Sequence, residues 1–257
     1  MDVAGKTVFI AGATSGLGHA TALQFAARGA HVVVGGRRIA LAEEIAAGLP
    51  SALGVELDIS SRDSVDAAVA AAVDRFGTIH VNVNTAGLNN SVPLVDAEGR
   101  ASVHQPEFWD ALTKMIDTNL LGTFTIMSVV AEQMIRNTPD EHGERGVIVN
   151  TSSAAGVEGS ATMTGYAATK AGIIGLTLPA ARDLAGLGIR VNTIIAGGFE
   201  TPMLGPSGDA LAAIARDIPN PQRIGRPAEF AHLAVHMTEN TYLNGESVRL
   251  DGGYRLR

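Results

Sequence analysis

Residues 7–26 read TVFIAGATSGLGHATALQFA: a short apolar run, a glycine-rich turn and an Ala-rich amphipathic run. The turn places Gly12, Gly16 and Gly18 between a predicted strand and a predicted helix. Glycines let a backbone approach a pyrophosphate closely, and the first turn of a helix offers N–H donors and a positive dipole end. Because the spacing differs from the common G-x-G-x-x-G fingerprint, the segment alone fits a plain strand-to-helix turn as well as a dinucleotide site.

The alternation of short β-branched runs with longer Ala-rich runs continues along the whole chain. It is typical of repeated βαβ units, and strands that are apolar throughout indicate a parallel sheet covered on both faces. The pattern predicts strands at residues 7–10, 31–34, 54–57, 80–84, 146–150, 189–195 and 246–250. It predicts helices at residues 16–28, 39–47, 62–76, 106–136, 165–187 and 228–239. We therefore expect one α/β domain over residues 1–257, a Rossmann-type doubly wound parallel sheet of about seven strands in a three-layer α/β/α arrangement.

Two stretches, residues 88–105 and 199–226, do not follow this rhythm. Each follows a predicted strand, and ligands of open parallel sheets bind outside the carboxyl ends of the strands. We expect both stretches to be substrate-covering loops, with ordinary insertion as the alternative.

Composition narrows the function classes. The formal net charge is −7, which disfavours nucleic acid and anionic membranes as partners. There is no cysteine, which excludes disulfides, thiolate metal sites and a cysteine nucleophile. Neither a signal-peptide layout nor a run of about eighteen apolar residues is present, so a soluble, cytoplasmic protein is expected.

Three polar positions suggest chemistry. Tyr166 and Lys170 are four residues apart in a predicted helix and so share a face, where a lysine favours the phenolate form of a tyrosine. Ser153 follows the strand at residues 146–150, a place where a hydroxyl can hold a substrate oxygen. Taken separately, the pair also fits a solvated helix face and the serine an ordinary turn.

The order of these motifs resembles the short-chain dehydrogenase/reductase family over essentially the whole chain. The resemblance rests on the glycine-rich turn, NTAG at residues 84–87, Asn119, and Ser153 thirteen residues before Tyr166. It implies a catalytic tetrad in which Tyr166 exchanges the substrate proton and Ser153 hydrogen-bonds the substrate oxygen. Lys170 would bind the nicotinamide ribose and lower the tyrosine pKa, and Asn119 would hold a relay water. The residues expected to bind the cofactor are Gly12, Thr14, Ser15, Gly16, Leu17, Gly18, Arg37, Arg38, Asp58, Ile59, Asn84, Ala86, Gly87, Tyr166, Lys170, Gly197, Phe199 and Thr201.

The choice between NAD and NADP depends on the end of the second strand. An acidic residue usually accepts the adenosine ribose hydroxyls of NAD there, but this chain has Gly36-Arg37-Arg38. Two guanidiniums are able to pair with a 2′-phosphate, so NADP is favoured over NAD. Against this, Ser15 stands where many NADP-using relatives have a basic residue.

The C-terminal half is similar to a subfamily of the same family, the type-2 3-hydroxyacyl-CoA dehydrogenases, in residues 139–155, 172–191, 225–233 and 242–252. This resemblance implies a 3-hydroxyacyl/3-oxoacyl-CoA substrate. Besides the Ser153 and Tyr166 hydroxyls, we expect an apolar trough formed by Leu88, Val92, Leu94, Val157, Met163, Phe199, Met203 and Leu204. A 3-oxoacyl-ACP reductase, a steroid or other ketone reductase, and a catalytically idle cofactor-binding scaffold remain alternatives.

The sequence also allows expectations about metal binding by histidines and about the oligomeric state. His232 and His236 have a metal-compatible spacing without an apparent third ligand, so no metal is expected. His104 is expected to be a solvated loop residue. The family resemblance implies a homotetramer, to which the apolar face of residues 108–134 and the closing LDGGYRLR are suited.

Overall fold

Seven strands form one parallel sheet in the computed structural model, which describes residues 1–91, 93–205 and 209–256. The strands are β1 (Thr7–Ala11), β2 (His31–Gly36), β3 (Ala52–Glu56), β4 (Val81–Asn84), β5 (Gly146–Ser153), β6 (Ile189–Ala196) and β7 (Ser247–Leu250). Their spatial order is β3-β2-β1-β4-β5-β6-β7. The order reverses between β1 and β4, which creates the switch point where open α/β sheets bind ligands.

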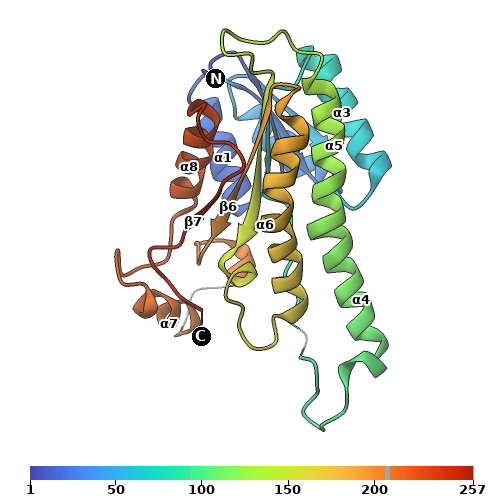
Figure 1. Cartoon of the computed structure of the whole chain (residues 1–257), viewed down its shortest axis with the longest axis vertical. Helices are drawn as coiled ribbons and strands as arrows, with labels where there is room; N and C mark the ends of the chain where they lie inside the picture. The colour runs from blue at the N-terminus through green and yellow to red at the C-terminus, as the bar shows by residue number, and fades with distance from the viewer. Residues whose placement is uncertain (92, 206–208, 257) are drawn as a thin grey trace.

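Helices cover both faces of this sheet, so the predicted three-layer Rossmann-type fold is confirmed (Figure 1). One layer consists of α1 (Gly16–Ala26), α2 (Ile39–Ala47) and α8 (Pro227–Glu239). The other consists of α3 (Arg62–Phe76), α5 (Gly122–Met134) and α6 (Thr164–Ala185), with α4 (Pro106–Met115) beyond the sheet edge. The short α7 (Asp209–Asp217) and the 3-10 turns Ser102–His104, Ala154–Gly156 and Pro202–Leu204 lie in loops. No helix among the described residues is long and apolar enough to cross a membrane.

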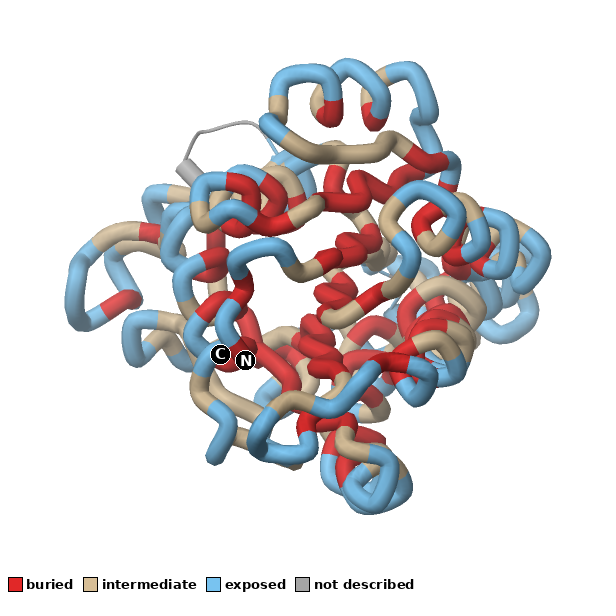
Figure 2. Tube along the Cα trace, turned by 90° about the horizontal axis from the view of Figure 1, so that it is seen from above, coloured by how far each residue is buried: buried red, intermediate tan, exposed pale blue. Residues whose placement is uncertain are grey.

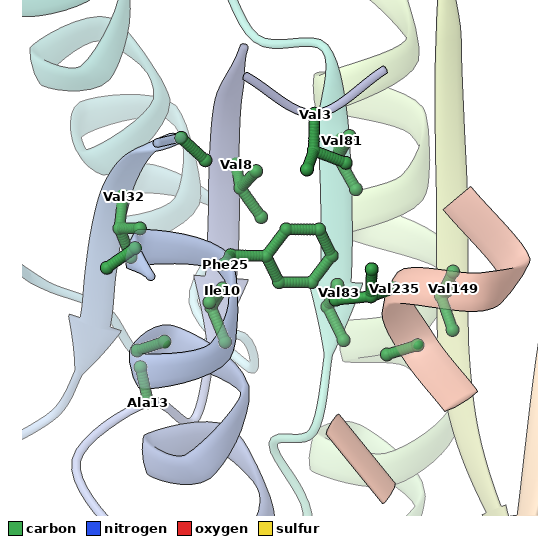
Figure 3. Close-up of a cluster of buried hydrophobic side chains, with 14 of the residues drawn as sticks. Val3, Val8, Ile10, Ala13, Phe25, Val32, Val81, Val83, Val149 and Val235 are labelled. Atoms are coloured by element: carbon green, nitrogen blue, oxygen red, sulfur yellow. The ribbon is translucent and has the colours of Figure 1, made fainter. Parts of the chain in front are cut away.

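The core consists of two clusters, one on each side of the sheet. Successive residues of β1 alternate between them: Val8 and Ile10 pack with Phe25 of α1, whereas Phe9 belongs to the opposite cluster. Figure 3 shows Phe25 among valines from β1, β2, β4 and β5, and Figure 2 shows the buried elements running through the centre of the molecule. Because both faces are buried, the strands are apolar at consecutive positions, as expected from the sequence.

Two element boundaries differ from the prediction in ways that matter for the site. The helix predicted at residues 106–136 is interrupted by a π-helical segment, Ile116–Leu121. Directly after it, a Cβ on Gly122 would come within 2.8 Å of the Ile59 carbonyl oxygen. The second difference is in β5, which extends to Ser153 because Thr151–Ser153 pair in register with β6. Tertiary pairing thus overrides the local preference of serine for turns.

Candidate active site

The glycine-rich turn forms the floor of a cavity of about 490 Å³ at the carboxyl end of the sheet. Gly12 has a positive φ of 80°, and a Cβ there would lie 2.8 Å from the Ala86 backbone nitrogen. A Cβ on Gly18 would lie 2.3 Å from the Gly12 carbonyl oxygen. Ser15, the N-cap of α1, makes no side-chain capping hydrogen bond, so the N–H groups of the first turn stay available to a phosphate.

Most of the residues expected at the cofactor line this cavity. They are Gly12, Thr14, Ser15, Gly16, Leu17, Gly18, Arg37, Arg38, Asp58, Ile59, Ala86, Gly87 and Thr201. Sequence reasoning missed the lining residues Gly36, Leu57, Thr85, Thr118 and Pro202. Gly36, Leu57, Thr85 and Pro202 are each next to an expected cofactor residue, whereas Thr118 is next to Asn119 of the tetrad.

Besides Tyr166 and Lys170 of the tetrad, three expected cofactor residues do not line the cavity. Asn84 is buried, its Oδ1 accepting from the Ala86 N–H at 3.2 Å, and so shapes the turn after β4. Gly197 lies against Asp251, whose Cβ would be 2.5 Å from a Cβ on the glycine. Phe199 is 5% exposed and packs edge-on against Phe230, because the bulky ring gains more from the core than from the cavity.

The tetrad residues come together from three elements at the edge of this cavity. Ser153 ends β5, and Tyr166 and Lys170 lie one turn apart near the start of α6. A hydrogen bond joins the Ser153 and Tyr166 side chains, and the Lys170 Nζ donates to the Thr151 carbonyl at 2.9 Å. Lys170 Nζ lies 5.8 Å from the centroid of the Tyr166 ring.

Gly87 separates the lysine from the asparagine of the tetrad. A Cβ on Gly87 would lie 3.4 Å from Lys170 Nζ and 3.2 Å from Asn119 Oδ1. Since Gly87 lines the cavity, both polar groups lie directly behind the cavity wall.

Asn119 lies in the π-helical segment, a deviation that is frequent at functional sites. Its Nδ2 donates to the Leu88 carbonyl at 2.9 Å and to Thr169 Oγ1 at 3.1 Å, and its Oδ1 accepts from the Leu88 N–H at 2.9 Å. The carboxamide therefore ties the loop after β4 to α6, and the water-holding role stays a prediction.

Burial dominates the electrostatics of the tetrad. It raises the pKa of Tyr166 above its usual value, an effect that the hydrogen bond with Ser153 only partly opposes. It also lowers the pKa of Lys170 to about 8, because the ammonium is removed from water. The pKa of Tyr166 is thus raised and not lowered as the sequence suggested, because desolvation by burial is the largest contribution and the Ser153 hydrogen bond opposes it only in part.

The adenosine end of the cavity carries the exposed Arg37 and Arg38. Burial opposes ionisation of Asp58, but hydrogen bonds from Ser60 and the charges of Arg37 and Lys114 outweigh it and lower the pKa of that carboxyl. The Arg38 Nη2 reaches the Thr14 carbonyl at 3.4 Å.

An apolar cluster adjoins the tetrad on the side away from the glycine-rich turn. Its buried members are Met115, Ala155 and Tyr166, and Leu88, Leu112, Met163 and Leu256 pack against them. Leu88 also lines the cofactor cavity, so the two regions are continuous at this residue. Leu256 was not expected here, because no local pattern connects the end of the chain with Tyr166.

The other residues of the expected trough are spread out. Met203 lines the cofactor cavity, whereas Val157, Leu94 and Leu204 are exposed on loops. Phe199 is buried beside a separate cavity of about 140 Å³, and Val92 lies outside the described residues. A wide groove under α7 shares Thr201 and Pro202 with the cofactor cavity.

The histidines lie apart from these cavities. His104 is exposed in the loop before α4, and His232 and His236 are exposed on α8. Within the described ranges, no group of three or more His, Cys, Asp or Glu side chains is arranged to hold a metal ion.

Comparison with known proteins places the chain among dehydrogenases. The family model for short chain dehydrogenases matches residues 6–212. A 3-hydroxyacyl-CoA dehydrogenase type-2 from Bos taurus is 40% identical over 258 residues, with 100% of this chain and 97% of the relative covered.

Two solved structures are similar along their full length. The crystal structure of a 3-hydroxyacyl-CoA dehydrogenase type-2 from Mycobacterium avium has a TM-score of 0.92 and 39% identity, covering 98% of this chain and 97% of that one. A 3-ketoacyl-(acyl-carrier-protein) reductase from Brucella melitensis, complexed with NADH, has a TM-score of 0.86 and 30% identity, covering 98% of both chains.

Proposed function

Since the chain belongs to the short-chain dehydrogenase family, we propose that it interconverts a 3-hydroxyacyl-CoA and the corresponding 3-oxoacyl-CoA. The chain is an oxidoreductase that acts on CH–OH groups, and the thioester is the substrate that its similarity to the type-2 dehydrogenases favours. The observation that carries this proposal is the position of Leu88, which joins the cofactor cavity to the apolar cluster around Tyr166. An oxygen held at Ser153 and Tyr166 thus has apolar surface beside it for an acyl chain.

The proposed mechanism assigns one task to each polar group. When bound, the nicotinamide cofactor supplies a hydride to C3 or accepts one from it. In reduction, the Tyr166 hydroxyl donates its proton to the developing alkoxide and the Ser153 hydroxyl donates a hydrogen bond to the same oxygen. The pKa of Tyr166 is raised by burial, so its hydroxyl is protonated at neutral pH and carries the proton that reduction requires. Lys170, whose Nζ lies behind the cavity wall at Gly87, is the residue proposed to bind the nicotinamide ribose.

NADP(H) is the proposed cofactor. The cradle at Gly12 and Gly18, where added Cβ atoms would clash, suits the close approach of a pyrophosphate. The strand β2 ends in Gly36, so no carboxylate lies there to repel a 2′-phosphate. Arg37 and Arg38 line the cavity beside this glycine. Titrating NADPH and NADH should give tighter NADPH binding, and Arg37→Ala should weaken NADPH by about tenfold or more with little effect on NADH. Tighter NADH binding that is unchanged in Arg37→Ala would refute this choice.

The substrate proposal is tested with a panel of ketones and both cofactors. We expect reduction of acetoacetyl-CoA, with kcat/KM rising over moderate acyl lengths by up to about fourfold for each fully buried CH₂. The same 3-oxoacyl groups on acyl carrier protein test the reductase alternative, which the Brucella melitensis structure favours. Good activity on a cyclic ketone or steroid, with none on any thioester, would refute the substrate while leaving the oxidoreductase intact.

A homotetramer is the proposed assembly. Large apolar side chains stay half exposed on and between α4 and α5, namely Trp109, Leu121 and Phe124. Burying such side chains between copies is the usual source of stability in symmetric oligomers. Sedimentation equilibrium should give four times the chain mass, and a monomer at micromolar concentration would contradict the proposal.

A further inference from the structure

The last residues of the chain turn back toward the candidate active site. After β7 ends at Leu250, the tail reaches the loop that follows β5, and Leu256 packs against the cluster containing Ala155 and Tyr166. Figure 1 shows the C-terminus at the same end of the molecule as the start of α6. An apolar side chain from the extreme end of the sequence is thus in the group of residues that surrounds the candidate proton donor.

Glu158 fastens this tail. It lies five residues after Ser153, and its Oε2 accepts from the Leu256 backbone N–H at 3.0 Å. Its Oε1 accepts from Arg249 Nη1 at 2.8 Å and lies 3.3 Å from Arg255 Nε.

Asp251 completes the network from the other side. Its Oδ2 pairs with Arg249 Nη2 at 2.6 Å and Arg255 Nη1 at 3.2 Å, and its Oδ1 accepts from the Gly253 N–H at 2.9 Å. The Asp251 side chain is only 7% exposed, so this is a partly desolvated network and not a set of isolated surface pairs.

The network has a definite geometric effect. Its Arg249 lies in β7, whereas Asp251 and Arg255 belong to the tail that follows this strand and Glu158 to the loop that follows β5. It positions the backbone of Leu256, and through it an apolar side chain that packs against the cluster containing Ala155 and Tyr166.

We infer that the C-terminal tail forms one wall of the acyl-chain site, with Leu256 as a specificity-determining contact and Glu158 as the positioning residue that holds it. This inference rests on the proposed function, because it assigns the acyl part of that substrate to this wall. A short acyl group bound at Ser153 and Tyr166 does not reach the tail, whereas a longer one packs on Leu256.

The test compares acetoacetyl-CoA with 3-oxooctanoyl-CoA in Leu256→Ala, in Glu158→Gln and in a chain ending at Tyr254. For the longer substrate, we expect KM to rise by about fivefold or more with kcat retained, because apolar contact is lost. Acetoacetyl-CoA kinetics and the Kd for NADPH should stay within about twofold of the wild type. Leu187→Ala removes the same atoms from an exposed leucine after α6 and should change neither substrate.

Any other result contradicts either this inference or the proposed function on which it rests. An unchanged ratio of the two kcat/KM values in Leu256→Ala and in the shortened chain would overturn the inference. Equal losses for both substrates and for NADPH binding, with a lowered melting temperature, would mean that the tail is structural and would overturn it too. If the wild type reduces no thioester, the proposed function fails separately. The variants are then compared on a large and a small ketone that it does reduce, where Leu256→Ala must still raise KM for the larger one.

Discussion

Replacing Glu144 by Gln should destabilise the fold while leaving the active site intact. Glu144 and Arg190 form an ion pair in which each residue is 7% exposed. The carboxylate accepts from Arg190 Nε and Nη2 at 3.1 Å each, a bidentate contact. The same guanidinium donates to four backbone carbonyls in the segment from the end of α8 to the turn before β7.

The magnitude follows from this burial. Glutamine keeps the size of the side chain but leaves the Arg190 charge without its counter-charge, and breaking a buried pair in this way costs about 3–5 kcal/mol. For a chain of this length, each kcal/mol lowers the melting temperature by about 2–4 °C, so we expect a fall of about 6–20 °C. Turnover at 25 °C should be retained, because Arg190 is the second residue of β6, at the opposite end of the sheet from the cavity.

The assay is thermal unfolding. The protein concentration is kept fixed, because assembly of the chains also contributes to the melting temperature. Glu132→Gln is the matched control, since Glu132 pairs with Arg136 at 2.9 Å on the surface and should cost less than about 1 kcal/mol. Equal melting temperatures for the two variants would refute the reasoning that burial makes this ion pair important.

Three further predictions concern proton-binding groups. Tyr166→Phe should lower turnover by at least about 10²-fold with NADPH binding kept, since only the proton donor is removed, and undiminished turnover would disprove the assignment. Lys170→Met should abolish turnover yet raise the melting temperature at pH 7. The folded pKa of about 8 lies below the unfolded value of 10.5, so the charged lysine is destabilising below pH 8, and the gain should shrink as pH rises toward 10.5. A constant gain across that range would contradict this. His80 accepts from the Thr7 N–H at 3.1 Å and its pKa is lowered to about 4 by burial, so the unfolded chain binds its proton first as pH falls below 6.5. Stability should therefore decline between pH 6.5 and 4, less steeply in His80→Gln, and equal slopes in melting temperature against pH would exclude His80 as a cause.

Local signals were sufficient for most of the architecture. The helix at residues 62–76 was predicted with its observed bounds, because Ser61 accepts from the Ser64 N–H at its start and Gly77 ends it with a positive φ of 81°. Strands such as β1 and β2 were recognisable because they are buried on both faces and so are rich in consecutive apolar residues. Fold class and the order of the motifs are therefore properties of short segments.

Only part of the candidate site could be predicted from such local patterns. The Gly-rich turn and the four-residue spacing of Tyr166 and Lys170 are local patterns, and the structure places Lys170 behind the wall of the cavity that the turn lines. Thr118 and Leu256 carry no such pattern, since they take part through a π-helical turn and through a tail fastened by Glu158.

What the sequence by itself determined is the succession of strands, helices and caps, because hydrophobic periodicity and capping act over a few residues. Only the tertiary structure decided that β5 extends to Ser153, that Phe199 packs in the core, and that the Tyr166 pKa is raised. Strand pairing, packing and desolvation all depend on neighbours that are distant in sequence. The chemistry of a group such as Tyr166 is therefore set by surroundings that exist only once the chain has folded.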